Sequence, residues 1–148
     1  MLFRSVRGST RIEDLEVRDL LQSQGAPCLM VWGEILQDGE AIGRTLGLFC
    51  RPKDLALHDP GLRVDAVTPA GDGAFAVTVS TEKPALWAWL SMETADLRCS
   101  DNFFCMRPGA PRELLVSPSR PGAPDVMAKR LRLASLYDLS GHPGTGEA

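Results

Sequence analysis

Hydrophobic and polar positions alternate along short segments of the chain, and turn residues separate these segments about every ten positions. Phe75, Val77 and Val79 alternate with small or polar residues, which is typical of a strand with one buried face. The other segments that we predict as strands are Leu29–Leu36, Ile42–Phe49, Leu62–Val67, Ala85–Met92, Phe103–Met106, Glu113–Val116 and a last strand from Leu131 to Asp138. Short strands at this spacing predict an all-β antiparallel sandwich of about seven to nine strands.

The two ends of the chain fit the alternation less well. Thr10 and Glu13 have the spacing of a helix capping box, but Leu15, Val17 and Asp19 alternate as in a strand, which is the interpretation that we adopt. Residues 117–124 are rich in Pro, Ser and Gly and predict a connecting loop. Residues 139–148 predict a disordered tail.

One predicted strand has no polar face. Ala85–Leu90 contains two indoles and no charge; Trp87 and Trp89 fall on one side, while Leu86, Ala88 and Leu90 fall on the other. A strand of a β-sandwich ordinarily has one apolar face that is buried in the core and one polar face that is exposed to solvent. We therefore expect something besides the chain's own core to cover the second face.

Several aromatic and polar residues of the chain allow two interpretations each. Trp32, Trp87 and Trp89 are core or interface anchors, or a platform on which sugar rings stack. Ser100-Asp101-Asn102 is a self-capped turn, since these side chains bond nearby backbone, or a polar ligand site. Phe103 and Phe104, next along the chain, are expected on opposite faces of the following strand.

Composition and charge exclude several classes of protein. The 148 residues, 44% hydrophobic and 24% charged, suit one soluble globular domain. A net charge of −3 argues against general nucleic-acid binding. The longest apolar run is far shorter than the ~20 residues of a membrane-spanning helix, and no signal peptide is visible.

The cysteines and histidines do not form a recognisable metal site. The chain has four cysteines and no C-x-x-C pair: Cys28, Cys50, Cys99 and Cys105. We therefore predict no metal, no cofactor and free thiols, with a disulfide between Cys99 and Cys105 as the alternative. Free thiols without a visible signal peptide favour a cytoplasmic protein.

No residues assemble a catalytic pattern. Neither His58 nor His142 has a triad-like setting, and no phosphate-binding glycine loop is present. The carboxylates that a glycosidase would need are scattered: Glu34, Glu40, Glu82, Glu93 and Glu113. We assign no catalytic residue.

The segment Ser100-Asp101-Asn102-Phe103-Phe104, with Pro108-Gly109 and Arg112-Glu113 after it, resembles a stretch in the C-terminal immunoglobulin-like domain of glycoside hydrolase family 2 β-mannosidases. Other parts of the chain agree with this resemblance: Asp38-Gly39, Arg51–Leu55, Ala85–Leu90 and Leu131–Asp138. Ala110 departs from it, because the family usually has an acidic residue after Pro-Gly.

The resemblance implies an Ig-like β-sandwich over residues 38–138 that is not itself catalytic. It makes residues 1–37 the N-terminal strands of the sandwich or the end of a preceding domain. The parent would be a retaining exo-acting enzyme that releases terminal β-D-mannose, with its catalytic glutamates on a barrel that this chain lacks. The exo-glucosaminidases of the same family leave the substrate open.

The partners implied are the catalytic and other domains of that parent, with a weak homo-oligomer as a further possibility. Two alternatives stay open: a carbohydrate-binding module that uses Trp87 or Trp89, and a free-standing Ig-like interaction domain.

Overall fold

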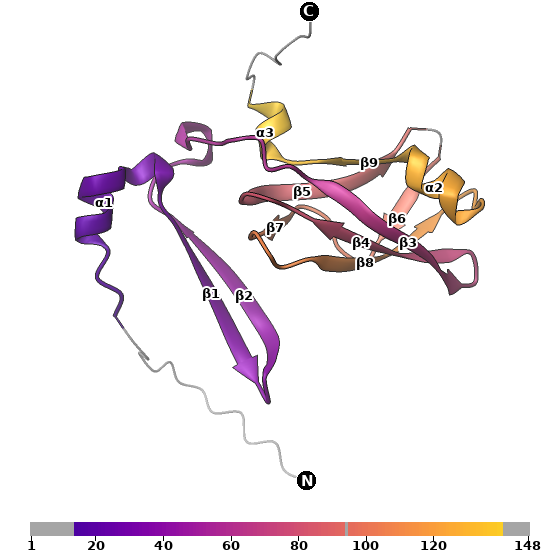
Figure 1. The fold of residues 1–148 in the computed structure, drawn as a ribbon, viewed down its shortest axis with the longest axis horizontal. Helices are drawn as coiled ribbons and strands as arrows, with labels where there is room; N and C mark the ends of the chain where they lie inside the picture. The colour runs from indigo at the N-terminus through magenta and orange to yellow at the C-terminus, as the bar shows by residue number, and fades with distance from the viewer. Residues whose placement is uncertain (1–13, 94, 141–148) are drawn as a thin grey trace, which may run out of the picture. The chain divides into compact units, whose positions relative to one another are not determined.

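A computed structural model of the chain describes residues 14–93 and 95–140 (Figure 1). The chain divides into two compact units, Met1–Leu55 and Ala56–Ala148. The domain boundaries expected from the sequence, at residues 37/38 and 138/139, stay predictions.

The first unit contains a β-hairpin after a short helix. Its elements are α1 (Arg18–Gln24), the 3-10 turn η1 (Ala26–Cys28), β1 (Met30–Gln37), β2 (Glu40–Leu48) and the 3-10 turn η2 (Pro52–Asp54). The tight turn joins the two strands as predicted, because Asp38 and Gly39 adopt φ values of 53° and 86°, which suit a short hairpin connection.

The strand predicted over Leu15–Asp19 is wrong, because α1 begins at Arg18. The residues after Asp19 are Leu20-Leu21-Gln22, all good helix formers, and the Leu21 N–H donates to the Val17 carbonyl at 2.9 Å. Gly25 then ends the helix with φ 83°. Thr10 and Glu13, whose spacing is that of a capping box, lie outside the described residues.

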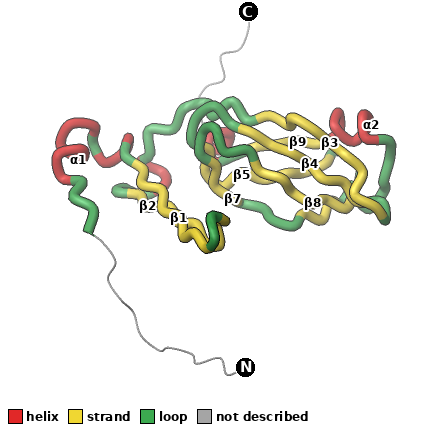
Figure 2. The backbone as a smooth tube through the Cα atoms, turned by 60° about the horizontal axis from the view of Figure 1, so that its bottom comes forward, coloured by secondary structure: helices red, strands yellow, loops and turns green. Residues whose placement is uncertain are grey.

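The second unit is built from two antiparallel sheets. One has the order β3-β4-β8-β6 and the other the order β7-β5-β9. The elements are β3 (Arg63–Gly71), β4 (Ala74–Ser80), β5 (Ala85–Met92), β6 (Leu97–Cys99), β7 (Phe104–Met106), β8 (Arg112–Pro118), α2 (Pro124–Arg130), β9 (Leu131–Ala134) and α3 (Leu136–Leu139). Figure 2 shows these strands in yellow, with α2 at one end of them. The predicted all-β, Ig-like sandwich is therefore confirmed.

The hydrophobic core lies between these two sheets. Phe75, Val77 and Val79 alternate inward along β4 as predicted. They pack in one buried cluster with residues of the other strands and of α2: Ala85, Ala88, Leu90, Phe104, Met106, Leu114, Val116, Met127 and Leu131. Val77 lies opposite Leu114 and Phe75 lies opposite Val116, so buried side chains of β4 and β8 pack side by side.

The strand predicted from Leu131 to Asp138 ends early, at Ala134. Ser135 caps the short helix α3 instead. Its backbone N–H donates to Asp138 Oδ2 at 2.7 Å, and its hydroxyl Oγ donates to the same oxygen at 3.2 Å. The loop predicted at 117–124 is also shorter, since β8 runs to Pro118 and α2 begins at Pro124. Residues 141–148 of the predicted tail lie outside the described residues.

Adjacent residues of β8 provide a matched test of this core. Leu114 is 1% exposed and Leu115 is 51% exposed. Leu114→Ala is expected to lower the free energy of unfolding by about 2–5 kcal/mol, because it leaves a cavity in the core, whereas Leu115→Ala costs about 1 kcal/mol or less. Urea denaturation of both variants measures the difference. Equal losses would place β8 in a different register.

Candidate interaction surface

Strand β5 contains a β-bulge at Leu86 and Trp87. Ala85 lies opposite Met106 and Ala88 lies opposite Phe104, so two residues of β5 face one residue of β7. Trp87 adopts φ 51°, the left-handed region that a bulky residue rarely enters. The bulge breaks the regular alternation expected from the sequence: Ala85 and Leu86 are both buried.

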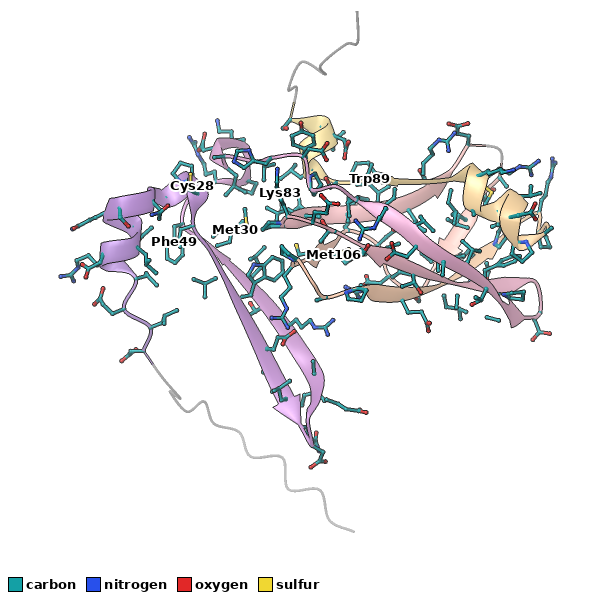
Figure 3. The ribbon with its side chains drawn as sticks, viewed as in Figure 1. Cys28, Met30, Phe49, Lys83, Trp89 and Met106 are labelled. Atoms are coloured by element: carbon teal, nitrogen blue, oxygen red, sulfur yellow. The ribbon has the colours of Figure 1, made fainter. Side chains whose placement is uncertain are left out.

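The bulge leaves the Trp87 indole 42% exposed, while Ala88 and Leu90 return to the core. Trp89 is half-buried on β5; Figure 3 labels it, together with Met106 of β7. The second face of this strand is therefore apolar and reaches solvent in the described part of the chain.

Phe103 enlarges this face. Its side chain is 66% exposed and its ring lies 6.0 Å from that of Trp89, centroid to centroid, with 31° between the planes. Phe103 also has a left-handed backbone, with φ 58°. We call Trp87, Trp89 and Phe103 the aromatic surface. Two of its three residues are held in a conformation that costs roughly 1–3 kcal/mol each.

Ser100–Phe103, the sheet-crossing corner, leads from β6 in one sheet to β7 in the other. Within this corner, the Asn102 side chain makes the hydrogen bonds to Leu90 that a neighbouring strand would otherwise make. Asn102 Oδ1 accepts the Leu90 N–H at 2.9 Å, and Asn102 Nδ2 donates to the Leu90 carbonyl at 3.4 Å. The backbone N–H and C=O of Leu90 are thereby both satisfied on the side where β7 has already ended.

The other polar residues of the corner bind β8. Ser100 donates its N–H to the Leu115 carbonyl at 2.8 Å, and its Oγ accepts the Leu115 N–H at 3.1 Å. The Asp101 carboxylate accepts from the Arg112 guanidinium, whose carbon lies 4.7 Å from the centre of the Phe104 ring. All of these hydrogen bonds join residues of the chain to one another.

The remaining residues singled out in the sequence lie elsewhere. Pro108 and Gly109 form the turn between β7 and β8, where Gly109 has φ 72°. Trp32 belongs to β1 of the first unit, and so to a different sheet from Trp87 and Trp89. The structure thus places Phe103 against Trp89, a contact that the sequence did not predict, and leaves Trp87 exposed two residues earlier on β5.

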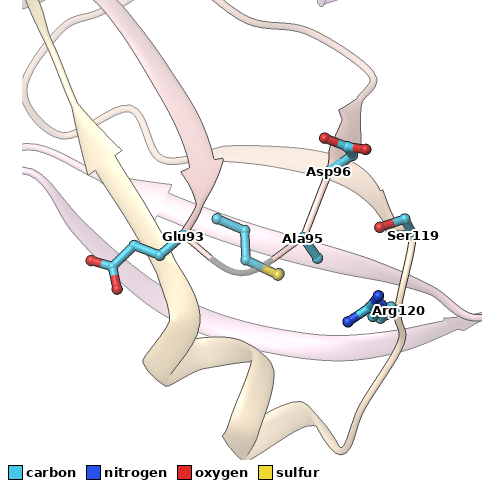
Figure 4. A pocket seen from close by; sticks show the side chains of 6 residues that line it. Glu93, Ala95, Asp96, Ser119 and Arg120 are labelled. Carbon is cyan, nitrogen blue, oxygen red and sulfur yellow. The ribbon is translucent and has the colours of Figure 1, made fainter.

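The described residues also form an open cavity of about 380 Å³ in the second unit (Figure 4). Glu93 lies on one side, and Asp96, Ser119 and Arg120 lie on the other. Glu93 is paired with Arg132 at 2.8 Å, and both side chains are more than half exposed. Such a carboxylate is solvated and paired with a cation, whereas the general acid of a glycosidase needs a setting that keeps it protonated.

Within residues 14–93 and 95–140, no three His, Cys, Asp or Glu side chains are grouped so that they could hold a metal ion. No helix among these residues is long and apolar enough to cross a membrane. Burial raises the pKa of the Cys99 thiol, so this cysteine stays protonated and slow to react near neutral pH.

Comparison with known proteins agrees with the fold. Residues 57–139 match a family of mannosidase Ig-fold domains. The chain belongs to this family, the C-terminal Ig-like domain found in glycoside hydrolase family 2 β-mannosidases. No curated protein matches the chain. The matched segment contains the aromatic surface and the whole sheet-crossing corner.

Two substitutions of Phe103 test whether its backbone is held in the left-handed region. Asn tolerates φ near 58°, whereas Val is β-branched and does not. Phe103→Val is therefore expected to destabilise the fold by about 1–2 kcal/mol more than Phe103→Asn, although Val is the more hydrophobic. Thermal unfolding of the two variants checks this order. If Val is tolerated as well as Asn, the left-handed conformation is not required.

Proposed function

We propose that the chain is a non-catalytic accessory domain of a β-mannosidase-like glycoside hydrolase, which it supports by packing its aromatic surface against another domain. The parent hydrolyses O-glycosyl bonds and releases terminal β-D-mannose. The observation that carries this proposal is the exposure of Trp87 and Phe103 on a strained backbone. Strain of this kind is concentrated at functional positions, because folding alone does not favour it.

The family supports the first part of the proposal, because an Ig-fold domain of mannosidases sits with other domains of a parent protein. The aromatic surface supports the second part. Aromatic residues are enriched in the centres of protein interfaces. At ~25 cal/mol per Å², an interdomain patch of several hundred Å² contributes several kcal/mol before the cost of association.

The carboxylates of the chain favour a non-catalytic role. Three of the five glutamates considered from the sequence form exposed ion pairs with arginines: Glu34 with Arg44, Glu82 with Arg63 and Glu93 with Arg132. A general acid needs a buried or like-charged setting that raises its pKa. By resemblance, the acid/base and nucleophile of the parent lie on its barrel.

A carbohydrate-binding module remains the alternative, and two contacts favour docking over it. The Phe103 ring lies against Trp89 and occupies surface that a sugar ring would need. The Asn102 amide, the nearest polar side chain in the sequence to Phe103, is already hydrogen-bonded to the backbone N–H and C=O of Leu90. A sugar site needs polar groups that are available to hydroxyls.

The same proposal places the protein in a reducing compartment such as the cytoplasm. All four cysteines are free: Cys28 is exposed and the other three are partly buried. Free thiols are typical of proteins from reducing compartments.

Serine substitutions on the aromatic surface test the proposal. In the purified chain, the double variant Trp87→Ser/Phe103→Ser is expected to bind less of the dye ANS and to self-associate less, because the uncovered apolar area is smaller. Leu115→Ser, which changes an exposed leucine outside the aromatic surface, is the matched control and should retain both properties. Unchanged dye binding and association in the double variant would contradict the proposal.

Sugar assays on the same samples separate the alternatives. We expect no turnover of 4-nitrophenyl β-D-mannoside and no change in NMR chemical shifts on addition of mannose or manno-oligosaccharides. Saturable shifts that disappear in Trp87→Ala would establish the carbohydrate-binding module in place of docking.

A further inference from the structure

The segment that leads into the sandwich is hydrogen-bonded to the turn between β4 and β5. We call residues 57–61 the entry segment; they precede β3 and belong with it to the second unit. The carbonyl oxygen of Pro60 accepts the backbone N–H groups of Glu82 and Lys83 at 2.9 and 3.1 Å. The Thr81 hydroxyl donates to the same oxygen at 2.8 Å. We call these three bonds the clamp; Figure 3 labels Lys83.

Both sides of the clamp are held in place. Thr81 is buried, and its hydroxyl also lies 2.6 Å from the Lys83 carbonyl oxygen, so its single proton is shared between two acceptors. In the entry segment, Gly61 adopts φ 61° and its N–H donates to Asp59 Oδ1 at 2.9 Å. Because a buried polar group is costly to leave unpaired, these bonds restrict residues 81–83 to one conformation.

The bulge of β5 begins directly after this turn. Its two residues, Leu86 and Trp87, face one residue of β7. Without the bulge, regular antiparallel pairing would place Leu86 opposite Met106 and move Ala85 out of the strand into the turn. Trp87 would then return from φ 51° to the extended region that a bulky residue prefers. The strand can make this slip only if the turn accepts one more residue.

We infer that the clamp fixes the bulge of β5, and with it the way in which Trp87 is presented on the aromatic surface. The strained backbone of Trp87 favours the slip, whereas the clamp opposes it, because the turn cannot lengthen while residues 81–83 are bonded to Pro60. The chain reaches the sandwich from the first unit through the entry segment, so displacing this segment would alter the aromatic surface. The consequence for docking rests on the proposed function.

NMR spectra of the purified 148-residue chain test the inference, because the Cα and Cβ chemical shifts of Trp87 distinguish a left-handed from an extended backbone. Thr81→Val removes the hydroxyl with little change in shape. The Glu82 and Lys83 amides are expected to exchange about 10-fold faster, and the Trp87 shifts to move toward those of a regular strand. Thr81→Ser keeps the hydroxyl and should retain the original exchange rates and shifts.

A second variant changes the clamp from the entry segment. A Cβ at Gly61 would lie 3.2 Å from side-chain atoms of Glu82 and would be strained at φ 61°, so Gly61→Ala should also move the Trp87 shifts toward strand values. Gly71→Ala is the matched control, because φ there is 88° and a Cβ meets nothing within 4 Å. Val77→Ala weakens the core and should lower the melting temperature without moving the Trp87 shifts.

Three results would overturn the inference. If Thr81→Val accelerates exchange at residues 82 and 83 while Trp87 stays left-handed, the bulge does not depend on the clamp. If Thr81→Val changes neither exchange nor shifts, the hydroxyl does not hold the turn. If Val77→Ala moves the Trp87 shifts equally far, the cause is a general loss of stability. These readouts report backbone conformation, so the dye-binding test of the proposed function can fail while this inference stands.

Discussion

The two hydrogen bonds between the Asn102 side-chain amide and the backbone of Leu90 are the interaction on which the sandwich depends most. β5 is the central strand of its sheet, yet β7 pairs with it only as far as Ala88. Asn102 continues the hydrogen bonding beyond that point by presenting an amide where a strand would present a peptide. Because Ser100 is bonded to Leu115 in the opposite sheet, the corner holds the two layers together.

The aromatic surface follows from this constraint. Once Asn102 is fixed against Leu90, the chain has one residue in which to turn into β7, and Phe103 makes that turn with a positive φ. Phe104 then enters the core beneath Arg112, while Phe103 remains outside against Trp89. The same corner that stabilises the fold therefore exposes an aromatic ring, which connects the structural role of the motif with its proposed role in docking.

The pattern of hydrophobic and polar residues predicted those elements whose structure depends on residues close in the sequence. The alternation of Phe75, Val77 and Val79 predicted a half-buried strand, and Asp38-Gly39 predicted a hairpin turn; both are confirmed. At the ends of the chain, short-range alternation was misleading. Leu15, Val17 and Asp19 alternate, but Leu21 bonds back to Val17 in a helix, and Ser135 and Asp138 close a capping box that ends the last strand.

The candidate site was less predictable, because its geometry is set by tertiary contacts. Charge and polarity predicted that Ala85–Leu90 has two apolar faces, but no sequence signal reports the bulge at Trp87 or the contact between Phe103 and Trp89. Arg112 belongs to the stretch that carries the family resemblance, but its contacts were not predicted: only the fold brings it to both Asp101 and the Phe104 ring. The one available signal was Asp101-Asn102, a pair that tolerates unusual backbone.

Replacing Asn102 by alanine, with Asp101→Ala as the control, is the most direct measurement of this account. Asn102→Ala leaves the backbone N–H and C=O of Leu90 without their side-chain partner, so the free energy of unfolding should fall by about 2–4 kcal/mol and the Leu90 amide should lose its protection against exchange. Asp101→Ala breaks a partly exposed ion pair and should cost about 1 kcal/mol or less. If the two variants are equally stable and Leu90 remains protected, the corner does not hold the sheets together.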